Sequence, residues 1–294
     1  METTFPKTGL LEYLRVEAIR FLDENPCNRM GEAWGDERIW EAPLLGSAPG
    51  ADPIFETFKD KVDPQHWTPV EAFAAGGFEA KAEELSVVSW ILPHNSLTKK
   101  DNAQQNDMPS ERWARSRVFG ESVNVKLRAH MAKLLQDANI EAVAPMSLPG
   151  WAWLRSERYI HTSNWSERHI AHACGLGTFG LCEGLITPVG KAVRIGSIIL
   201  RGQINPTPRP YTRHDEYCLF KEKKTCGACI KRCPAGAISG QGHDKLLCDA
   251  YLNNEITQYV EEHYGFKGYG CGLCQTGVPC SSGIPGENKR EIVL

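Results

Sequence analysis

Residues 226–234 read Cys226-Gly-Ala-Cys229-Ile-Lys-Arg-Cys233-Pro234, and residues 271–280 read Cys271-Gly-Leu-Cys274-Gln-Thr-Gly-Val-Pro279-Cys280. The chain has 294 residues and eleven cysteines, and eight of these cysteines lie between positions 218 and 280. Cysteines gathered in CxxC pairs are typical of metal ligands in a reducing compartment, whereas disulfides are typical of secreted chains. The sequence therefore predicts a metal site built by its last quarter.

The spacing of the first stretch indicates iron–sulfur ligands. A bacterial ferredoxin run reads C-x2-C-x2-C-x3-C-P, and its fourth cysteine serves the other cluster. Cys226, Cys229 and Cys233 match the last three cysteines of that run. Its first position is Lys223, which cannot bind iron, so we expect Cys218 to replace it.

The second stretch is irregular as well, because Cys280 follows Cys274 by six residues instead of four. Cys248 can supply the missing ligand. If the ferredoxin crossover holds, we predict two [4Fe–4S] clusters. The first set of ligands is then Cys218, Cys226, Cys229 and Cys280, and the second set is Cys233, Cys248, Cys271 and Cys274.

Two zinc sites, or one cluster with spare thiols, are the alternatives, since zinc also binds paired CxxC units. The Cys-Pro followed by Ala-Gly-Ala-Ile at 235–238 favours the ferredoxin type. The remaining cysteines are interpreted as small buried hydrophobic residues. They are Cys27, Cys174 and Cys182.

The bulk composition restricts partners and location. A formal net charge of −3 gives no reason for broad attachment to nucleic acid or to anionic lipid. The start of the chain shows no export signal, and no apolar run approaches eighteen residues. We therefore expect a cytoplasmic protein without a membrane partner.

Hydrophobic patterning predicts an α+β fold of two domains. We expect helices over 9–24, 110–138 and 164–174, the last one opened by a capping box of Asn164 and Glu167. We expect strands over 85–92, 141–144, 183–187 and 193–200. Three prolines between 206 and 210 indicate a stiff linker. The predicted domains are 1–205, with 1–70 as a wrapping extension, and 206–294.

The stretch Gly175-Leu-Gly177-Thr-Phe-Gly180 fits GxGxxG but does not predict a dinucleotide site. Such a site needs a preceding strand and a following helix, and the pattern here is the reverse. Its glycines instead allow a tight turn or a close approach to a large flat group.

The same region resembles a known family. The blocks Ser166-Glu-Arg-His-Ile-Ala-His-Ala-Cys-Gly175-Leu-Gly-Thr-Phe-Gly180 and Gly190-Lys-Ala-Val-Arg-Ile-Gly-Ser-Ile-Ile-Leu200, followed by the two cysteine motifs, resemble the epoxyqueuosine reductases. These enzymes resemble the reductive dehalogenases in turn. The likeness runs from about Leu85 to the end of the chain.

The resemblance implies a base-off cobalamin in a nitroreductase-like α/β domain, followed by a ferredoxin-like domain with two [4Fe–4S] clusters. It places the cofactor-binding residues at Arg158, Thr162, Gly175, Leu176, Gly177, Phe179 and Gly180. The family's catalytic aspartate stands fourteen residues before the GLG, where this chain has His161. We therefore expect His161 as the proton donor, with Tyr159 as the alternative.

Two departures from the family bear on the substrate. The helical-repeat tail used on tRNA is missing from the sequence, and the aspartate is replaced. We therefore expect a small-molecule substrate, no nucleic acid, and an external electron donor such as ferredoxin or flavodoxin. The alternatives are an iron–sulfur electron-transfer protein and an iron–sulfur flavoprotein, both without corrinoid chemistry.

Overall fold

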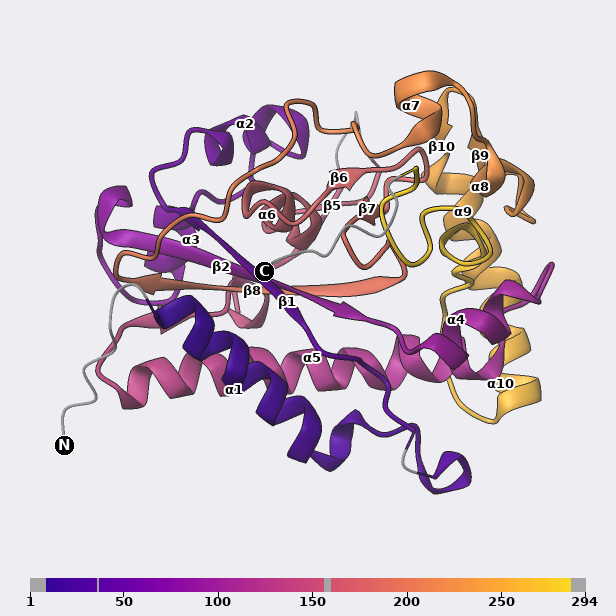
Figure 1. The fold of residues 1–294 in the computed structure, drawn as a ribbon, viewed down its shortest axis with the longest axis horizontal. Coiled ribbons are helices and arrows are strands. Elements are labelled where there is room, and N and C mark those ends of the chain that lie inside the picture. Colours follow the sequence, from indigo (N-terminus) through magenta and orange to yellow (C-terminus); the bar gives the residue numbers. More distant parts are fainter. Residues whose placement is uncertain (1–8, 36, 156–159, 287–294) are drawn as a thin grey trace.

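The computed structural model describes residues 9–35, 37–155 and 160–286. An antiparallel sheet of four strands forms its centre, in the order β1–β2–β8–β3 (Figure 1). The strands are β1 (Leu44–Pro49), β2 (Leu85–Pro93), β8 (Val193–Arg201) and β3 (Ala142–Val143). We call the sheet and its helices the large lobe.

The strand β2 is buried along its whole length, because helices cover both faces of the sheet. This explains its continuous apolar sequence, since a strand with one wet face would alternate apolar and polar residues. Trp90 of β2 lies opposite Gly196 of β8. A Cβ at Gly196 would come within 2.5 Å of the Trp90 indole, so only glycine leaves room for that ring.

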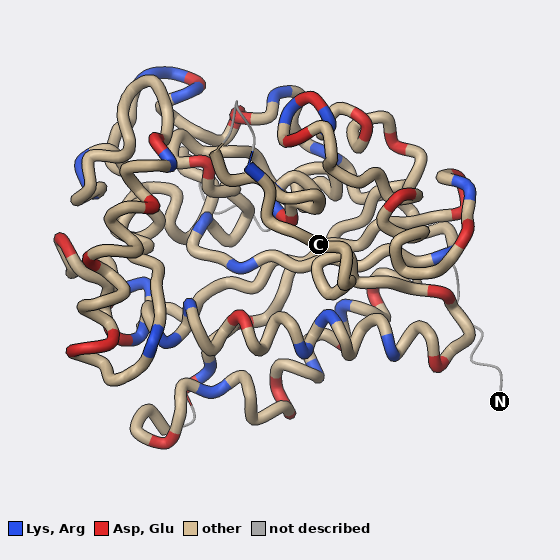
Figure 2. The backbone as a smooth tube through the Cα atoms, turned by 180° about the vertical axis from the view of Figure 1, so that it is seen from behind, with Lys and Arg blue, Asp and Glu red and all other residues tan. Residues whose placement is uncertain are grey.

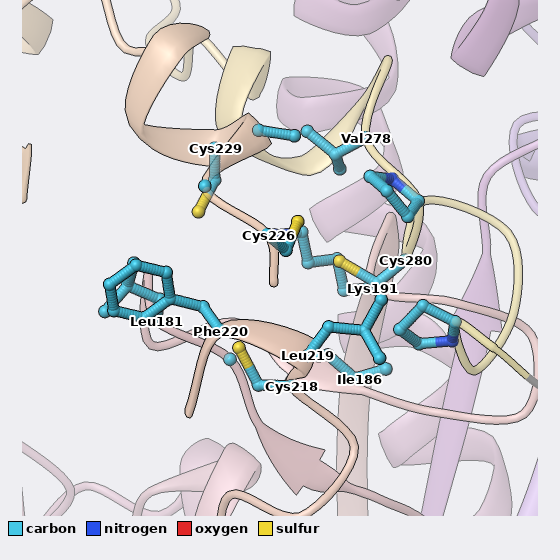
Figure 3. A pocket seen from close by; sticks show the side chains of 15 residues that line it. Leu181, Ile186, Lys191, Cys218, Leu219, Phe220, Cys226, Cys229, Val278 and Cys280 are labelled. Atoms are coloured by element: carbon cyan, nitrogen blue, oxygen red, sulfur yellow. The ribbon is translucent and has the colours of Figure 1, made fainter. Parts of the chain in front are cut away.

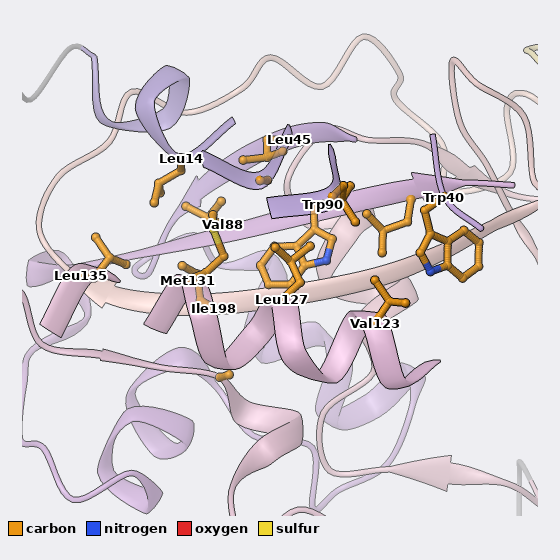
Figure 4. Packing of buried hydrophobic residues seen from close by; sticks show 14 of the residues in the cluster. Leu14, Trp40, Leu45, Val88, Trp90, Val123, Leu127, Met131, Leu135 and Ile198 are labelled. Carbon is orange, nitrogen blue, oxygen red and sulfur yellow. The ribbon is translucent and has the colours of Figure 1, made fainter. Parts of the chain in front are cut away.

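One face of the sheet packs against α1 (Leu10–Glu24) and α5 (Glu111–Asp137). Ser110 begins α5 by accepting a hydrogen bond from the backbone of Trp113. Val123, Leu127 and Met131 recur along one side of α5 and are fully buried, as Figure 4 shows. The helical period of these residues therefore places the core between α5 and the sheet.

The other face carries α2 (Ile54–Lys61), α3 (Pro69–Ala75) and α6 (Glu167–Ala173). Their core includes Phe55, Phe73, Trp165 and Ile170. Two short hairpins extend this layer toward the cysteines. They are β4 (Trp153–Leu154) with β5 (Thr162–Ser163), and β6 (Thr178–Phe179) with β7 (Leu185–Ile186).

Short elements around the cysteines form what we call the cysteine lobe, at one end of the sheet (Figure 1). They are α7 (Leu219–Lys223), α8 (Ala228–Lys231), β9 (Ile238–Ser239), β10 (Gly242–His243), α9 (Lys245–Tyr251) and α10 (Thr257–Tyr264). Ile256 and Val260 pack on Ala114 of α5. Arg232 donates to the backbone oxygens of Asn102 and Gln105, beside α4 (Ser96–Ala103). The two lobes are therefore in direct contact.

The mixed helix and strand fold that the sequence predicts is confirmed, and the long elements lie within a few residues of their expected bounds. Two expectations need correction. The first seventy residues do more than wrap the domain, because β1 is a strand of the central sheet and Trp40 and Phe55 are buried. The capping box is wrong, because Ser166 is the N-cap residue of α6 and Asn164 instead binds the backbone of Gly150 and Ala152.

Charged residues of both signs alternate over the backbone seen from behind (Figure 2), as expected for a chain close to neutral. Within the described ranges, no helix combines the length and the apolar character needed to cross a membrane.

Candidate iron–sulfur centre

One pocket brings together the first set of predicted ligands. Cys218, Cys226, Cys229 and Cys280 line it, and Figure 3 shows their sulfur atoms around a shared space. Three of them come from the region of α7 and α8, whereas Cys280 comes from the second cysteine stretch. The structure therefore joins the two stretches at one site, as the ferredoxin crossover requires.

The wall of this pocket is mainly apolar. Leu181 and Ile186 of the large lobe line it beside Leu219 and Phe220 of the cysteine lobe (Figure 3). The exception is Lys191, whose side chain enters the pocket from the large lobe. Four thiol donors in an apolar shell fit an iron–sulfur cluster, since thiolates hold the iron and the surrounding shell tunes its potential.

Three members of the second set lie near one another. Burial and the nearby thiols of Cys248 and Cys233 raise the pKa of Cys271 to about 12. The Cys182 thiol and burial raise the pKa of Cys274, with a smaller contribution from Cys271, and Cys274 packs against the cluster that contains Cys218 and Cys229. Cys271, Cys233 and Cys248 therefore lie close enough to act on one another, although the assignment of these thiols to one cluster stays a prediction.

Arg232 holds the loop that carries Cys271 and Cys274. Its Nε donates to the backbone oxygens of Leu273, at 3.2 Å, and Thr276, at 3.1 Å. The same guanidinium reaches α4 of the large lobe through Asn102. One cation therefore fixes the ligand loop and ties it to the larger part of the fold.

Sequence reasoning missed Cys182. This residue is 6% exposed and packs in the hydrophobic cluster that contains Cys218 and Cys229. The nearby thiols of Cys229 and Cys274 hold the pKa of Cys182 well below its ordinary value. Spacing rules could not find it, because it stands 36 residues before Cys218, two residues after the GxGxxG match. That position was the only feature of the sequence that pointed to Cys182.

A site for a single metal ion is distinct from a site for a cluster. Among the residues described here, no group of three or more His, Cys, Asp or Glu side chains is arranged to hold one metal ion.

The predicted proton donor lies at the junction of the lobes. Nε2 of His161 is 3.6 Å from Oδ2 of Asp249 on α9, and the backbone oxygen of His161 accepts from Lys245 Nζ at 3.3 Å. Asp249 directly follows Cys248 in the sequence. The alternative donor, Tyr159, lies outside the described residues, as does Arg158.

A second contact between the lobes is made by Glu183. Its carboxylate lies 3.7 Å from His243 and 3.4 Å from Lys245. The Cys248 thiol and the Glu183 carboxylate together raise the pKa of His243 to about 9. A carboxylate of the large lobe therefore pairs with two cations that stand just before Cys248 in the sequence.

The predicted cofactor-binding glycines approach protein backbone. Gly175 has a φ of 80°, and a Cβ there would lie 2.6 Å from the Pro208 oxygen. A Cβ at Gly177 would lie 2.2 Å from the Ile186 oxygen. The backbone nitrogen of Gly180 donates to Gly184 at 2.8 Å. These glycines allow the β6–β7 hairpin and the proline linker to pack closely.

The other predicted cofactor-binding residues that the structure describes also contact protein side chains or backbone. Leu176 is 3% exposed, and Thr162 donates to Asp63 Oδ2 at 2.9 Å. The ring of Phe179 packs on His169, with centroids 4.7 Å apart. Their role toward a cofactor stays a prediction.

Two curated proteins are similar to this chain in sequence, while no family model matches it. An epoxyqueuosine reductase from Francisella cf. novicida (strain Fx1) is 32% identical over 131 residues, which are 42% of this chain and 34% of the relative. An epoxyqueuosine reductase from Staphylococcus aureus (strain NCTC 8325 / PS 47) is 24% identical over 265 residues, 83% of this chain and 62% of the relative. The chain therefore spans less than two thirds of these relatives.

Solved structures share the fold. An epoxyqueuosine reductase from Streptococcus thermophilus aligns with a TM-score of 0.50 and 14% identity, over 96% of this chain and 68% of that one. A catabolic reductive dehalogenase aligns with a TM-score of 0.51 and 12% identity, over 95% of this chain and 38% of that one. The resemblance to epoxyqueuosine reductases and reductive dehalogenases that the sequence indicates is confirmed.

Proposed function

We propose that this protein is a reductase in which two [4Fe–4S] clusters in the cysteine lobe deliver single electrons to a base-off cobalamin in the large lobe. The similarity to epoxyqueuosine reductases and to the reductive dehalogenase fold supports the class of reaction. Bound cobalamin would supply the two-electron reductive cleavage of a substrate bond.

One observation supports the proposal above the rest: Cys218, Cys226, Cys229 and Cys280 surround a single apolar pocket. Leu181, Ile186 and Lys191 of the large lobe are among the residues that line it. A cluster held at this pocket would therefore border the large lobe directly. The apolar wall also keeps water away from iron and sulfide.

His161 is the residue that we assign to proton delivery. It lies where the resemblance places the family's acid, and its Nε2 faces Asp249 at 3.6 Å. A carboxylate at that distance can orient the imidazole. Reductive cleavage consumes protons as well as electrons, so a titratable group at the junction of the lobes suits the reaction.

The residues proposed for cobalamin are the described part of the predicted set, from Thr162 to Gly180. They lie on β5, on the connection between α6 and β6, and on the β6–β7 hairpin. Since Leu176 and Thr162 are buried against protein, we expect the backbone of this segment, more than its side chains, to support the corrin.

The substrate we propose is a small molecule, although the curated relatives are named for epoxyqueuosine reduction. Epoxyqueuosine, free or within RNA, is therefore the first compound against which a small-molecule substrate should be compared. His161 in the position of the family's aspartate is the feature of this chain that favours a different substrate.

Anaerobic reconstitution tests the proposal. The protein is loaded with iron and sulfide, mixed with cobalamin and separated from free cofactor by gel filtration. We expect about eight iron atoms per chain and co-eluting cobalamin with a base-off spectrum. An intact iron–sulfur protein that retains no cobalamin would leave the electron-transfer alternative, and retained flavin would leave the flavoprotein alternative.

A further inference from the structure

The first set of cysteines shares its pocket with one cation of the large lobe. The side chain of Lys191 lines the pocket together with Cys218, Cys226, Cys229 and Cys280 (Figure 3). Lys191 is 3% exposed, and it is the one lysine or arginine among the described residues that line this pocket. A single ammonium group therefore lies beside four thiol donors within an apolar wall.

The chain around Lys191 is held against the loop that carries Cys280. The Lys191 backbone nitrogen donates to the Cys280 oxygen at 2.9 Å, and the backbone nitrogen of Ala192 donates to the Ser281 oxygen at 3.5 Å. Gly190 precedes them with a φ of 92°, and a Cβ there would lie 2.2 Å from the Ser281 oxygen. Only glycine permits this close approach. The contact between the lobes therefore fixes the place where Lys191 enters the pocket.

The ammonium group lies beside sulfur and not beside a carboxylate. Its Nζ donates to Cys182 Sγ at 3.2 Å, and no Asp or Glu of the described ranges forms an ion pair with it. A buried ammonium is stable only when negative charge balances it. Four thiolates and the sulfides of a [4Fe–4S] cluster give the cluster a net negative charge. The cluster and the ammonium would therefore each supply the charge that the other lacks.

We propose that Lys191 raises the reduction potential of the first cluster, the one that Cys218, Cys226, Cys229 and Cys280 would hold. The inference rests on the proposed clusters and adds to them a role of the large lobe in their potential. A fixed positive charge favours the reduced cluster, because that cluster carries one more electron than the oxidised cluster. The charge acts strongly here because its burial keeps water and salt from screening it.

Lys191→Met tests the proposal, because methionine is close to lysine in size and carries no charge. The wild type and the variant are reconstituted anaerobically, their iron and sulfide are counted, and the potentials of both clusters are measured by EPR during a redox titration. We expect Lys191→Met to retain the wild-type iron content. The reduction equilibrium of one cluster should fall at least tenfold, or about 59 mV for one electron. The other cluster should keep its wild-type potential.

Lys224→Met is the matched control, because it removes the same charge near the same pocket from an exposed position. Lys224 Nζ lies 4.7 Å from the centroid of the Phe220 ring, and Phe220 lines the pocket. The Lys224 side chain is exposed, so water screens its charge. We expect both cluster potentials of this variant to stay at their wild-type values. Equal shifts in Lys191→Met and Lys224→Met would overturn the proposal.

Lys191→Arg decides the question if Lys191→Met binds no iron. It keeps the charge, so it should retain both the wild-type iron content and the wild-type potentials. Loss of iron from both variants, or a tenfold fall of the reduction equilibrium in Lys191→Arg, would overturn the role given to the charge.

The outcomes also separate this inference from the proposed function. A wild type without clusters would overturn both. Clusters that form without retained cobalamin would overturn the proposed function and leave the role of Lys191 to be decided by the potentials. Wild-type potentials in a Lys191→Met protein with full iron content would overturn the inference alone, as expected if Cys182 already neutralises the ammonium.

Discussion

Nε2 of His161 and Oδ2 of Asp249 lie 3.6 Å apart, and they connect the large lobe to the helix that carries Cys248. A proton donor at this place would act next to the proposed path of the electrons. We expect His161→Ala to lower the rate of substrate reduction about 100-fold, the smaller end of the usual contribution of a general acid. The measurement is turnover with a fixed excess of reductant.

His263→Ala is the control for that experiment, because His263 is an exposed histidine on α10 that stacks on Tyr259. It should keep wild-type turnover. Both variants should keep the wild-type iron content. A His161→Ala protein with full turnover would assign the proton to another group.

Replacement of a predicted ligand should remove iron, whereas replacement of a spare thiol should not. We expect Cys229→Ser to lose the iron of at least one cluster, because Cys229 is buried and its sulfur faces the shared pocket. Cys27→Ser should keep the wild-type iron content, since Cys27 lies away from that pocket. Equal iron in the two variants would contradict the assignment of the first set.

Replacement of Gly272 tests how closely the loop between Cys271 and Cys274 packs against α5. A Cβ at this position would lie 1.9 Å from the Trp113 indole, and its φ is 62°. We expect Gly272→Ala to displace the loop between Cys271 and Cys274 and to lower both the melting temperature and the iron content.

Gly265→Ala is the matched control, because Gly265 has a similar φ of 74° but a Cβ added there would meet no atom within 4 Å. It shares the conformational cost, about 1 kcal/mol, without the clash. If both substitutions changed the melting temperature and the iron content equally, the close contact with Trp113 would not be the cause of the change.

A buried carboxylic acid on α6 predicts a pH dependence of stability. Burial raises the pKa of Glu167 to about 7 from its ordinary 4.5, against the opposing charge of Arg128 at 3.5 Å. Because the folded state holds this proton more tightly, stability is present below pH 4.5 and is lost as the pH rises to about 7. The loss amounts to about 3 kcal/mol, at 1.36 kcal/mol per pKa unit.

Glu167→Gln removes this titration while keeping the size of the side chain. Denaturant unfolding of both proteins at several pH values between 5 and 8 should show the variant gaining stability relative to the wild type as the pH rises. A difference between the two that stays constant over this range would contradict the assigned pKa.

The sequence predicted the features that depend on local pattern. The bounds of β2, β8 and α5 follow from long apolar runs and from helical spacing, which survive in any tertiary context. The capping box failed because Asn164 found partners in the loop at Gly150, a contact between segments that no local rule describes.

The candidate site divides in the same way. The two cysteine stretches that begin at Cys226 and Cys271 could be recognised as ligand motifs because their cysteines are close in sequence. Cys182 and Lys191 were not, because the β6–β7 hairpin and the segment just before β8 bring them beside these ligands from the large lobe. Packing between segments that are far apart in the sequence decides such contacts. This packing produces no periodic pattern of residues in the sequence.

The proposed function requires two iron–sulfur clusters beside a reducible corrinoid. A single anaerobic EPR titration of the reconstituted protein with added cobalamin tests it most directly. We predict signals from two reduced [4Fe–4S] clusters and a base-off cobalt(II) signal that disappears as the potential is lowered. Cluster signals with a cobalt signal identical to that of free cobalamin would contradict it.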